Sequence, residues 1–369
     1  MGIKIILLII FFAVMAAVGI YSRRHVTSVD GFVLGGRSVG PWLTAFAYGT
    51  SYFSAVVFVG YAGQFGWKYG IASTWIGIGN ALIGSLLAWV VLGRRTKVMT
   101  QHLGSRTMPD FFGERYKSKS LKITASVIVF VFLIPYTASV YNGLSRLFAM
   151  AFNIPYTWCV VTMAAFTALY VILGGYMATA INDFIQGIIM LIGIVAVIAA
   201  VLNGQGGFMN AIAEMAKIPS DVPLTQGQPG AFTSFFGPDP VNLLGVVLLT
   251  SLGTWGLPQM IGKFYAIKDE KSISTGTIIS TIFAIIISGG CYFLGGFGRL
   301  FDSPEIYDKA GGAVVYDSII PHMLSMLPDL LIGVVVVLVL SASMSTLSSL
   351  VLTSSSTLTL DLLKDNIMK

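Results

Sequence analysis

Residues 341–349 read Ser-Ala-Ser-Met-Ser-Thr-Leu-Ser-Ser and directly follow a long apolar run. In a helix, Ser345, Ser348 and Ser349 share one face because their spacing is i, i+3 and i+4, and Thr346 lies beside them. The sequence therefore predicts a row of uncharged oxygens at the depth of a bilayer. Such oxygens are the ligands that a hard monovalent cation needs once it has lost most of its water.

The composition is that of a polytopic membrane protein. Of the 369 residues, 55% are hydrophobic and 10% are charged, and the mean hydropathy is +0.83. Apolar segments long enough to cross a hydrocarbon core of about 30 Å predict nine spans in an all-α fold. They lie near residues 5–22, 41–66, 70–92, 121–151, 155–175, 183–202, 241–265, 273–300 and 328–362.

The net charge of +6 follows this topology and does not indicate a nucleic-acid partner. With the N-terminus outside, sixteen lysines and arginines fall in inner loops, Arg24, Lys263 and Lys369 among them, and five, including Lys309, fall outside. The positive-inside rule thus predicts a multi-pass protein of the cell membrane, surrounded by lipid, with its N-terminus outside. The sequence leaves the oligomeric state open.

The reactive side chains do not indicate an enzyme. The two cysteines fall inside predicted spans, and the three histidines are far apart and have no metal-ligand spacing. No nucleophile motif accompanies them.

Two spans contain helix-breaking residues at corresponding places. The span 41–66 carries Gly49 and further glycines, and the span 241–265 carries Gly253, Gly256 and Pro258. Backbone groups freed at membrane depth are tolerated only where they face protein or line a cavity, so both spans are expected to unwind near their middles. Two broken helices in inverted halves indicate a secondary transporter. The alternative is that the glycines only permit close helix packing.

This pattern divides the chain into four parts. Residues 1–40 would form a peripheral helix and a cytoplasmic loop, and 41–202 a first repeat of five helices. Residues 203–240, rich in glycine and proline, would be an extracellular linker. Residues 241–369 would supply three helices of a second repeat, which is expected to be incomplete at its C-terminal end.

Three motifs carry a resemblance to a known family. They are Gly35-Gly36-Arg37-Ser38 followed by Gly40-Pro41, Leu173-Gly174-Gly175-Tyr176-Met177-Ala178 followed by Asn182-Asp183-Phe184-Ile185-Gln186, and the stretch from Ala342 to Ser349. Together they resemble the sodium:solute symporter family, which includes proline, pantothenate, sialic-acid and sugar symporters. The resemblance implies the leucine-transporter fold, an inverted repeat of five plus five helices.

The resemblance also implies a main Na⁺ site between the broken span 41–66 and the last span. Its ligands would be the backbone carbonyls of Thr50, Phe53 and Ala342 and the side-chain oxygens of Ser345 and Thr346.

Some relatives appear to hold a second Na⁺ nearer the cytoplasm. The matching residues here are Asp183, Ser345, Ser348 and Ser349, for a second ion or an ion exit. Asp183 could equally cap a helix start, where the helix dipole stabilises a carboxylate.

Solute candidates follow from the family's pocket between the two breaks. They are Tyr52, Ser54, Tyr136, Thr254, Trp255 and Gln259, although aromatic side chains of membrane proteins often serve packing or interface anchoring instead. The pocket is expected to contain no intramembrane Lys or Arg, with Arg146 reaching to the interface. A proline-like or other small zwitterionic solute is narrowly preferred, and monocarboxylates, pantothenate and sugars stay open.

The resulting hypothesis is sodium-coupled symport of a small organic solute by alternating access. One alternative is a membrane sensor or subunit that binds ion and solute without transporting them. Another is a proton-coupled carrier, for which Asp183 is the one reasonable ionisable group.

Overall fold

The computed structural model describes residues 2–23, 28–152, 154–308 and 312–364. Three of the charged residues assigned to loops above, Arg24, Lys309 and Lys369, lie outside the described residues. Within the described ranges the regular structure is helical, and strand-like pairing is limited to two isolated bridges, Val39 with Ile267 and Tyr307 with Val314.

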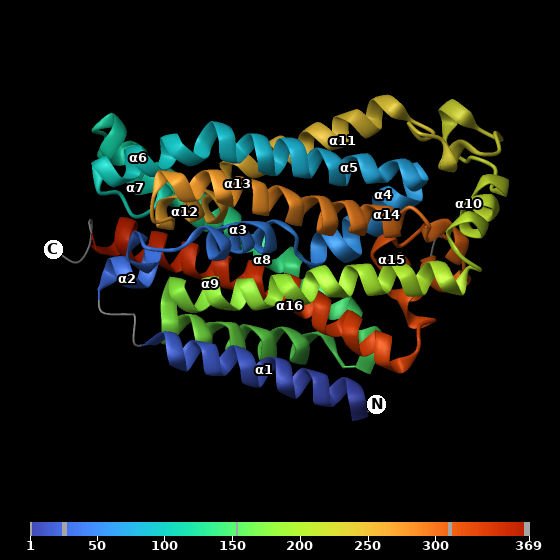
Figure 1. Cartoon of the computed structure of the whole chain (residues 1–369), viewed down its shortest axis with the longest axis horizontal. Helices are drawn as coiled ribbons and strands as arrows, with labels where there is room; N and C mark the ends of the chain where they lie inside the picture. The colour runs from blue at the N-terminus through green and yellow to red at the C-terminus, as the bar shows by residue number, and fades with distance from the viewer. Residues whose placement is uncertain (1, 24–27, 153, 309–311, 365–369) are drawn as a thin grey trace.

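The longer helices lie roughly parallel to the long axis of the molecule (Figure 1). Their bounds are α1 Gly2–Ser22, α2 Val29–Leu34, α3 Pro41–Tyr52, η3 Val56–Tyr61, α4 Ala62–Tyr69, α5 Thr74–Gly79, η5 Asn80–Leu87, η6 Trp89–Gly93, α6 Arg94–Leu103, α7 Met108–Tyr116, α8 Lys119–Phe152, α9 Tyr156–Gly204, α10 Phe208–Lys217, α11 Pro240–Leu252, η9 Gly253–Gly256, α12 Pro258–Ala266, α13 Glu270–Ala284, η10 Ile285–Gly289, α14 Gly290–Gly295, α15 Tyr316–Ser325, α16 Asp329–Ser356 and η13 Thr357–Lys364.

By length and composition, six helices in the described ranges could each cross a membrane, and a bent pair around Leu257 makes a seventh. Two of the six are 48 residues long, which corresponds to about 72 Å of helix and exceeds twice the hydrocarbon thickness. Each contains a glycine of positive φ, Gly70 at 61° or Gly175 at 53°, where the chain turns back. Dividing both helices at these glycines, and joining α3 to the short piece before Gly70, gives nine spans within the described ranges, the number expected from the sequence.

The first core helix is broken, as predicted. Helix α3 ends at Tyr52, and Phe53 has non-helical angles, φ −107° and ψ 90°, while its N–H still donates to the carbonyl of Gly49 at 3.2 Å. The hydroxyl of Ser54 then accepts from the N–H of Val56 at 3.2 Å and so caps the start of the next helical segment. A serine directly after the break therefore restarts the helix.

The second predicted break is also present. Helix α11 ends at Leu252, a tight turn follows, and α12 begins at Pro258 with a bend of 53°. Leu257 is extended, at φ −72° and ψ 122°. Proline suits the first position of α12 because that position needs no N–H donor.

Other glycines of the first broken span serve packing. A Cβ added to Gly66 would lie 2.0 Å from the carbonyl oxygen of Gly295, and one added to Gly63 would lie 2.6 Å from that of Tyr316. Helix α4 continues through both positions. The packing interpretation therefore holds for these two glycines, whereas the break itself lies at Phe53.

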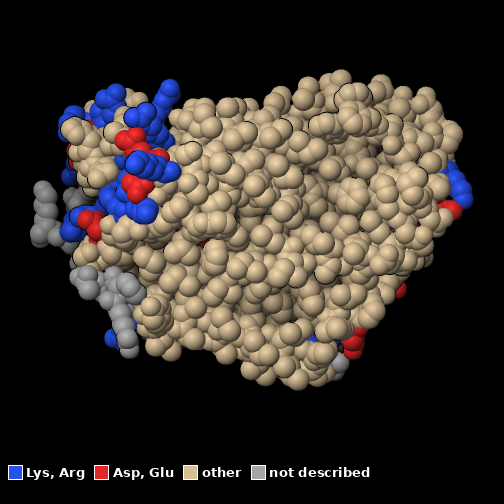
Figure 2. Space-filling view, in the orientation of Figure 1, with Lys and Arg blue, Asp and Glu red and all other residues tan. Residues whose placement is uncertain are grey.

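Basic side chains gather at one end of the molecule, over α6 and α7 (Figures 1 and 2). This end, the basic end, contains Arg94, Arg95, Arg115 and Lys117. The N-terminus lies at the opposite end in Figure 1. The asymmetry of charge expected from the sequence is thus visible along the long axis.

Candidate functional site

The site is built on the carbonyls that the first break sets free. The last four carbonyls of a helix have no intrahelical donor, and those of Thr50 and Ser51 are among them in α3. Both residues are buried, so water cannot satisfy these groups in the usual way. Their carbonyls instead meet hydroxyls of α16.

Ser345 and Thr346 supply those hydroxyls. The Oγ of Ser345 lies 3.1 Å from the carbonyl oxygen of Thr50 and 3.1 Å from that of Ala342. The Oγ1 of Thr346 lies 3.4 Å from the oxygen of Thr50, 3.5 Å from that of Ser51 and 3.1 Å from that of Ala342. The structure thus brings together four of the five predicted sodium ligands, and the fifth, Phe53, directly follows the last residue of α3.

The spacing of these oxygens fits a small cation. Neighbouring ligands of an octahedral ion that binds oxygen at about 2.4 Å, within the range known for Ca²⁺, lie roughly 3.4 Å apart. The distances from the two hydroxyls to the carbonyls run from 3.1 to 3.5 Å. Two hydroxyl protons serve three carbonyls here, so the group has a surplus of lone pairs that a cation would satisfy.

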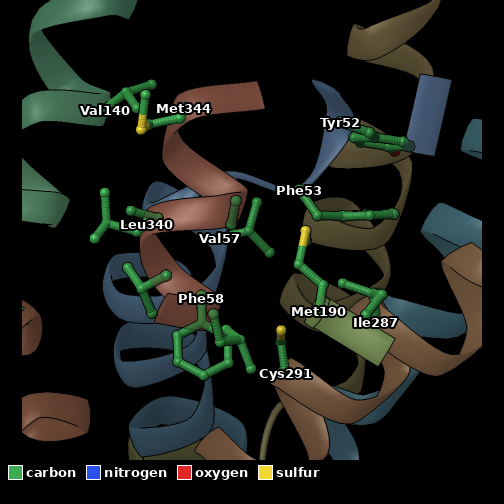
Figure 3. Packing of buried hydrophobic residues seen from close by; sticks show 14 of the residues in the cluster. Tyr52, Phe53, Val57, Phe58, Val140, Met190, Ile287, Cys291, Leu340 and Met344 are labelled. Carbon is green, nitrogen blue, oxygen red and sulfur yellow. The ribbon is translucent and has the colours of Figure 1, made fainter. Parts of the chain in front are cut away.

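Apolar side chains pack against one side of the break. The rings of Tyr52 and Phe53 are stacked, with centroids 4.4 Å apart and an interplanar angle of 12°. Figure 3 shows Phe53 beside Met190 and Ile287, on the side of the break away from α16. A dry surrounding strengthens the attraction between an ion and carbonyl dipoles.

Two hydroxyls earlier in α16 bond within their own helix. Ser341 donates to the carbonyl of Val337 and Ser343 to that of Val339, both at 2.7 Å and both four residues back. This back-bonding is the usual way to satisfy a serine within a membrane helix. Ser345 and Thr346 differ because they also reach the broken helix.

Two of the four residues predicted for a second ion contact a lysine. The Nζ of Lys263, on α12, lies 3.5 Å from the Oδ2 of Asp183 and donates to the Oγ of Ser349 at 2.9 Å. Ser348 instead donates to the carbonyl of Ser345, within its own helix, at 2.9 Å. Asp183 and Ser349 are therefore linked through an ammonium group.

One sequence prediction about Lys263 was wrong, because this lysine was assigned to a cytoplasmic loop. Its side chain is 3% exposed and lies in the second half of the bent span. Hydropathy placed the inner end of this span near residue 265 and so assigned Lys263 to the loop that follows. The ion pair with Asp183, which is far away in the sequence, allows the ammonium group to be buried.

The interpretation of Asp183 as a helix cap was also wrong. The second half of α9 begins after Gly175, so Asp183 lies about two turns inside the helix, too deep to cap it. Its carboxylate is buried. Its charge is balanced by the ion pair with Lys263 and not by a helix terminus.

One cavity gathers four of the six solute candidates. Its volume is about 310 Å³, at the lower end of the range for small-molecule sites, and Tyr52, Ser54, Tyr136 and Thr254 line it. The hydroxyl of Tyr52 also donates to the carbonyl of Thr250 at 3.0 Å and so joins the two broken helices.

Trp255 and Gln259 are not among the residues that line this cavity. The indole N–H of Trp255 donates to the carbonyl of Ile83 at 3.0 Å. Gln259 follows the bend at Pro258 and faces a smaller cavity of about 50 Å³ that Lys263 also lines. Its amide group has no hydrogen-bond partner within the described part of the chain.

Asn80 is a cavity residue that the sequence reasoning missed. Its Oδ1 accepts from the hydroxyls of Thr250 at 3.0 Å and Ser251 at 3.1 Å, and its Nδ2 lies 3.2 Å from the Oγ of Ser288. A lone buried asparagine within the apolar span 70–92 was the available signal, since an amide inside a membrane span needs several partners.

The fold has a counterpart of known structure. A Na⁺-coupled sialic acid symporter, solved in a substrate-bound outward-open state, matches all of this chain and 75% of its own length with a TM-score of 0.80 and 16% identity. The chain therefore has the all-α, leucine-transporter-like inverted-repeat fold that the resemblance implied.

The sequence comparisons concern proteins of greater identity. The "Sodium/proline symporter 2" of Staphylococcus saprophyticus is 32% identical over 371 residues, a match that covers 97% of this chain and 68% of that protein. The "Sodium/proline symporter" of Staphylococcus aureus is 31% identical over 370 residues, with the same coverage. These proteins are transporters and not enzymes.

The family model of the "Sodium:solute symporter family" matches residues 32–369. This match covers most of the chain, and the relatives and the apolar helices agree with it. The chain is thus a multi-pass membrane protein built for transport. It belongs to the sodium:solute symporter family.

Proposed function

We propose that this chain carries out sodium-coupled symport of a small organic solute, with Na⁺ bound where α3 ends against α16. One observation carries the proposal: the hydroxyls of Ser345 and Thr346 lie 3.1 and 3.4 Å from the freed carbonyl of Thr50. The carbonyls of Phe53 and Ala342 would complete the ligand set. Sodium is a transported substrate here.

The proposed solute is proline or another small zwitterion. Two relatives are named sodium/proline symporters, which supports this choice over a sugar. The cavity of about 310 Å³ also suits a small solute. Tyr52, Ser54, Tyr136 and Thr254 would contact it, while Trp255 would hold the second break in place through its bond to Ile83.

The proposed orientation places the basic end in the cytoplasm and the N-terminus outside, in line with the positive-inside rule (Figure 2). Residues 41–202 and 241–369 would then belong to the two inverted repeats, with 203–240 as an outer linker and 1–40 at the periphery. Sodium would drive transport by binding one of the two conformations of the alternating-access cycle more tightly than the other. An ion with equal affinity for both conformations would not shift the equilibrium between them.

The test uses the purified chain in lipid vesicles and radiolabelled proline. Accumulation should require an inward sodium gradient and should vanish when choline replaces sodium. Uptake that is unchanged in choline would refute sodium coupling. Uptake that instead follows an imposed proton gradient would favour the proton-coupled carrier, and sodium-dependent binding without accumulation would favour the sensor or subunit.

The choice of solute is tested separately. The thermal stability of the purified chain is measured with a panel of zwitterions, monocarboxylates, pantothenate and sugars, each with sodium and with choline. Proline should raise the melting temperature only in sodium. A sugar or a monocarboxylate that does so in its place would overturn the proposed solute and leave sodium coupling intact.

A further inference from the structure

The ammonium group of Lys263 lies among the side chains that would otherwise form a second sodium site. We propose that this ammonium is a built-in cation that replaces a second sodium ion, so that the chain binds one Na⁺ per cycle. The inference deepens the proposed function and rests on it for the first sodium ion. It concerns a residue that hydropathy places in a loop and that the structure places in the protein interior.

The contacts of Lys263 are those of a bound cation. Its Nζ lies 3.5 Å from the Oδ2 of Asp183 on α9, 2.9 Å from the Oγ of Ser349 on α16 and 5.3 Å from the centre of the Tyr176 ring. These groups supply a negative charge, a hydroxyl oxygen and an aromatic face, all of which attract cations. Three segments distant in the sequence thus converge on one positive charge.

Burial of the ion pair between Asp183 and Lys263 disfavours the binding of a second Na⁺. Asp183 and Lys263 have side chains that are 0% and 3% exposed, and a buried charge is tolerated only when it is paired. An ion bound to Asp183 and Ser349 would lie within about 4 Å of the ammonium, where repulsion at an effective dielectric of about 20 weakens binding by roughly a thousandfold. The residues present therefore do not fit a second Na⁺ while Lys263 stays in place.

The ammonium is also connected to the first sodium ligands. The Oγ of Ser349 accepts a hydrogen bond from Lys263, so its own O–H is free to donate to the Oγ of Ser51, which lies 2.8 Å away. The carbonyl of Ser51 in turn lies 3.5 Å from the Oγ1 of Thr346. Lys263 thereby helps to hold the end of α3 in the position that presents its carbonyls.

The test counts sodium ions from the stability of the purified chain in lipid nanodiscs, with choline as the replacement cation. Above the dissociation constant, each bound ion changes the folding equilibrium tenfold for each tenfold rise in sodium. We expect a tenfold change for the wild type and a hundredfold change for Lys263→Met, in which Asp183 and Ser349 become available to an ion. Lys263→Met/Asp183→Asn should return to tenfold.

The control is Lys97→Met, which removes a buried lysine of α6 outside this site and should stay at tenfold. A tenfold change in Lys263→Met, or a hundredfold change in the wild type, would overturn the inference. If the stability of the wild type does not depend on sodium, the first sodium site is refuted. In that case a tenfold change in Lys263→Met would show that an ion binds only after the lysine is removed, which still supports the role of Lys263. Should Lys263→Met not fold, binding of ²²Na⁺ to the wild type decides, with one ion per chain expected and two ions overturning the inference.

Discussion

Replacing Ser345 by alanine should weaken sodium binding far more than it weakens folding. The hydroxyl is one of the five oxygens proposed to bind the ion, and it lies 3.1 Å from the carbonyl of Thr50 on the broken helix. Hydrogen bonds to charged groups contribute about 1.5–3 kcal/mol, and a similar value for an ion–hydroxyl contact predicts a rise of roughly 10- to 150-fold in the sodium dissociation constant. Thr346→Ala should behave alike. The assay is a sodium titration of the melting temperature at constant ionic strength, without solute.

Ser343→Ala is the matched control. Ser343 is equally buried and lies on the same helix, but its hydroxyl donates to the carbonyl of Val339 within that helix. Its loss should reduce the free energy of unfolding by about 0.5–1.5 kcal/mol and leave the sodium affinity unchanged. The reasoning would be refuted if Ser345→Ala and Ser343→Ala had the same sodium affinity, because the contact with Thr50 would then have no role in ion binding.

Two further substitutions test the surroundings of the site. Gly66→Ala should lower the free energy of unfolding by about 3 kcal/mol or more, since its Cβ would lie 2.0 Å from the carbonyl oxygen of Gly295. Gly262→Ala has open space around its Cβ and should raise the free energy of unfolding by up to about 1 kcal/mol. Equal melting temperatures of the two variants would contradict this packing. Asn80→Ala removes an acceptor that the hydroxyls of Thr250 and Ser251 share, which should cost about 1–3 kcal/mol and weaken proline binding with little change in sodium affinity. An equal loss of both affinities would indicate a general loss of structure.

The two helix breaks could be predicted because their causes are local. Pro258 fits the first position of a helix, and Ser54 can cap one, so the sequence around each break already favours a restart. The oxygen face of α16 could be predicted as well, since it needs only helical spacing. These features depend on residues a few positions apart.

The roles of individual glycines could not be predicted in the same way. Gly66 serves packing because the backbone of Gly295 approaches it, and no local pattern announces that approach. Gly175 turns the chain back within an apolar run, where spacing alone does not distinguish a turn from a flexible position. Contacts between distant segments decide both cases.

Lys263 shows the same limit for charges. A hydropathy window treats a lysine near the end of a span as part of a loop, because an unpaired charge would be costly inside the membrane. The cost falls when a carboxylate and a hydroxyl from other helices meet the ammonium, as Asp183 and Ser349 do. The favourable partner is visible only in three dimensions, so the sequence indicated that Asp183 and Ser349 lie together but not that a lysine contacts both.

Ser51 connects the two positive charges of the proposed site. Its carbonyl faces the hydroxyl of Thr346 in the group assigned to sodium, and its side chain bonds Ser349, which accepts from Lys263. A displacement of the end of α3 would therefore disturb both groups at once. We therefore expect Ser51 to couple ion binding to the position of the broken helix. Coupling between two states requires such a link.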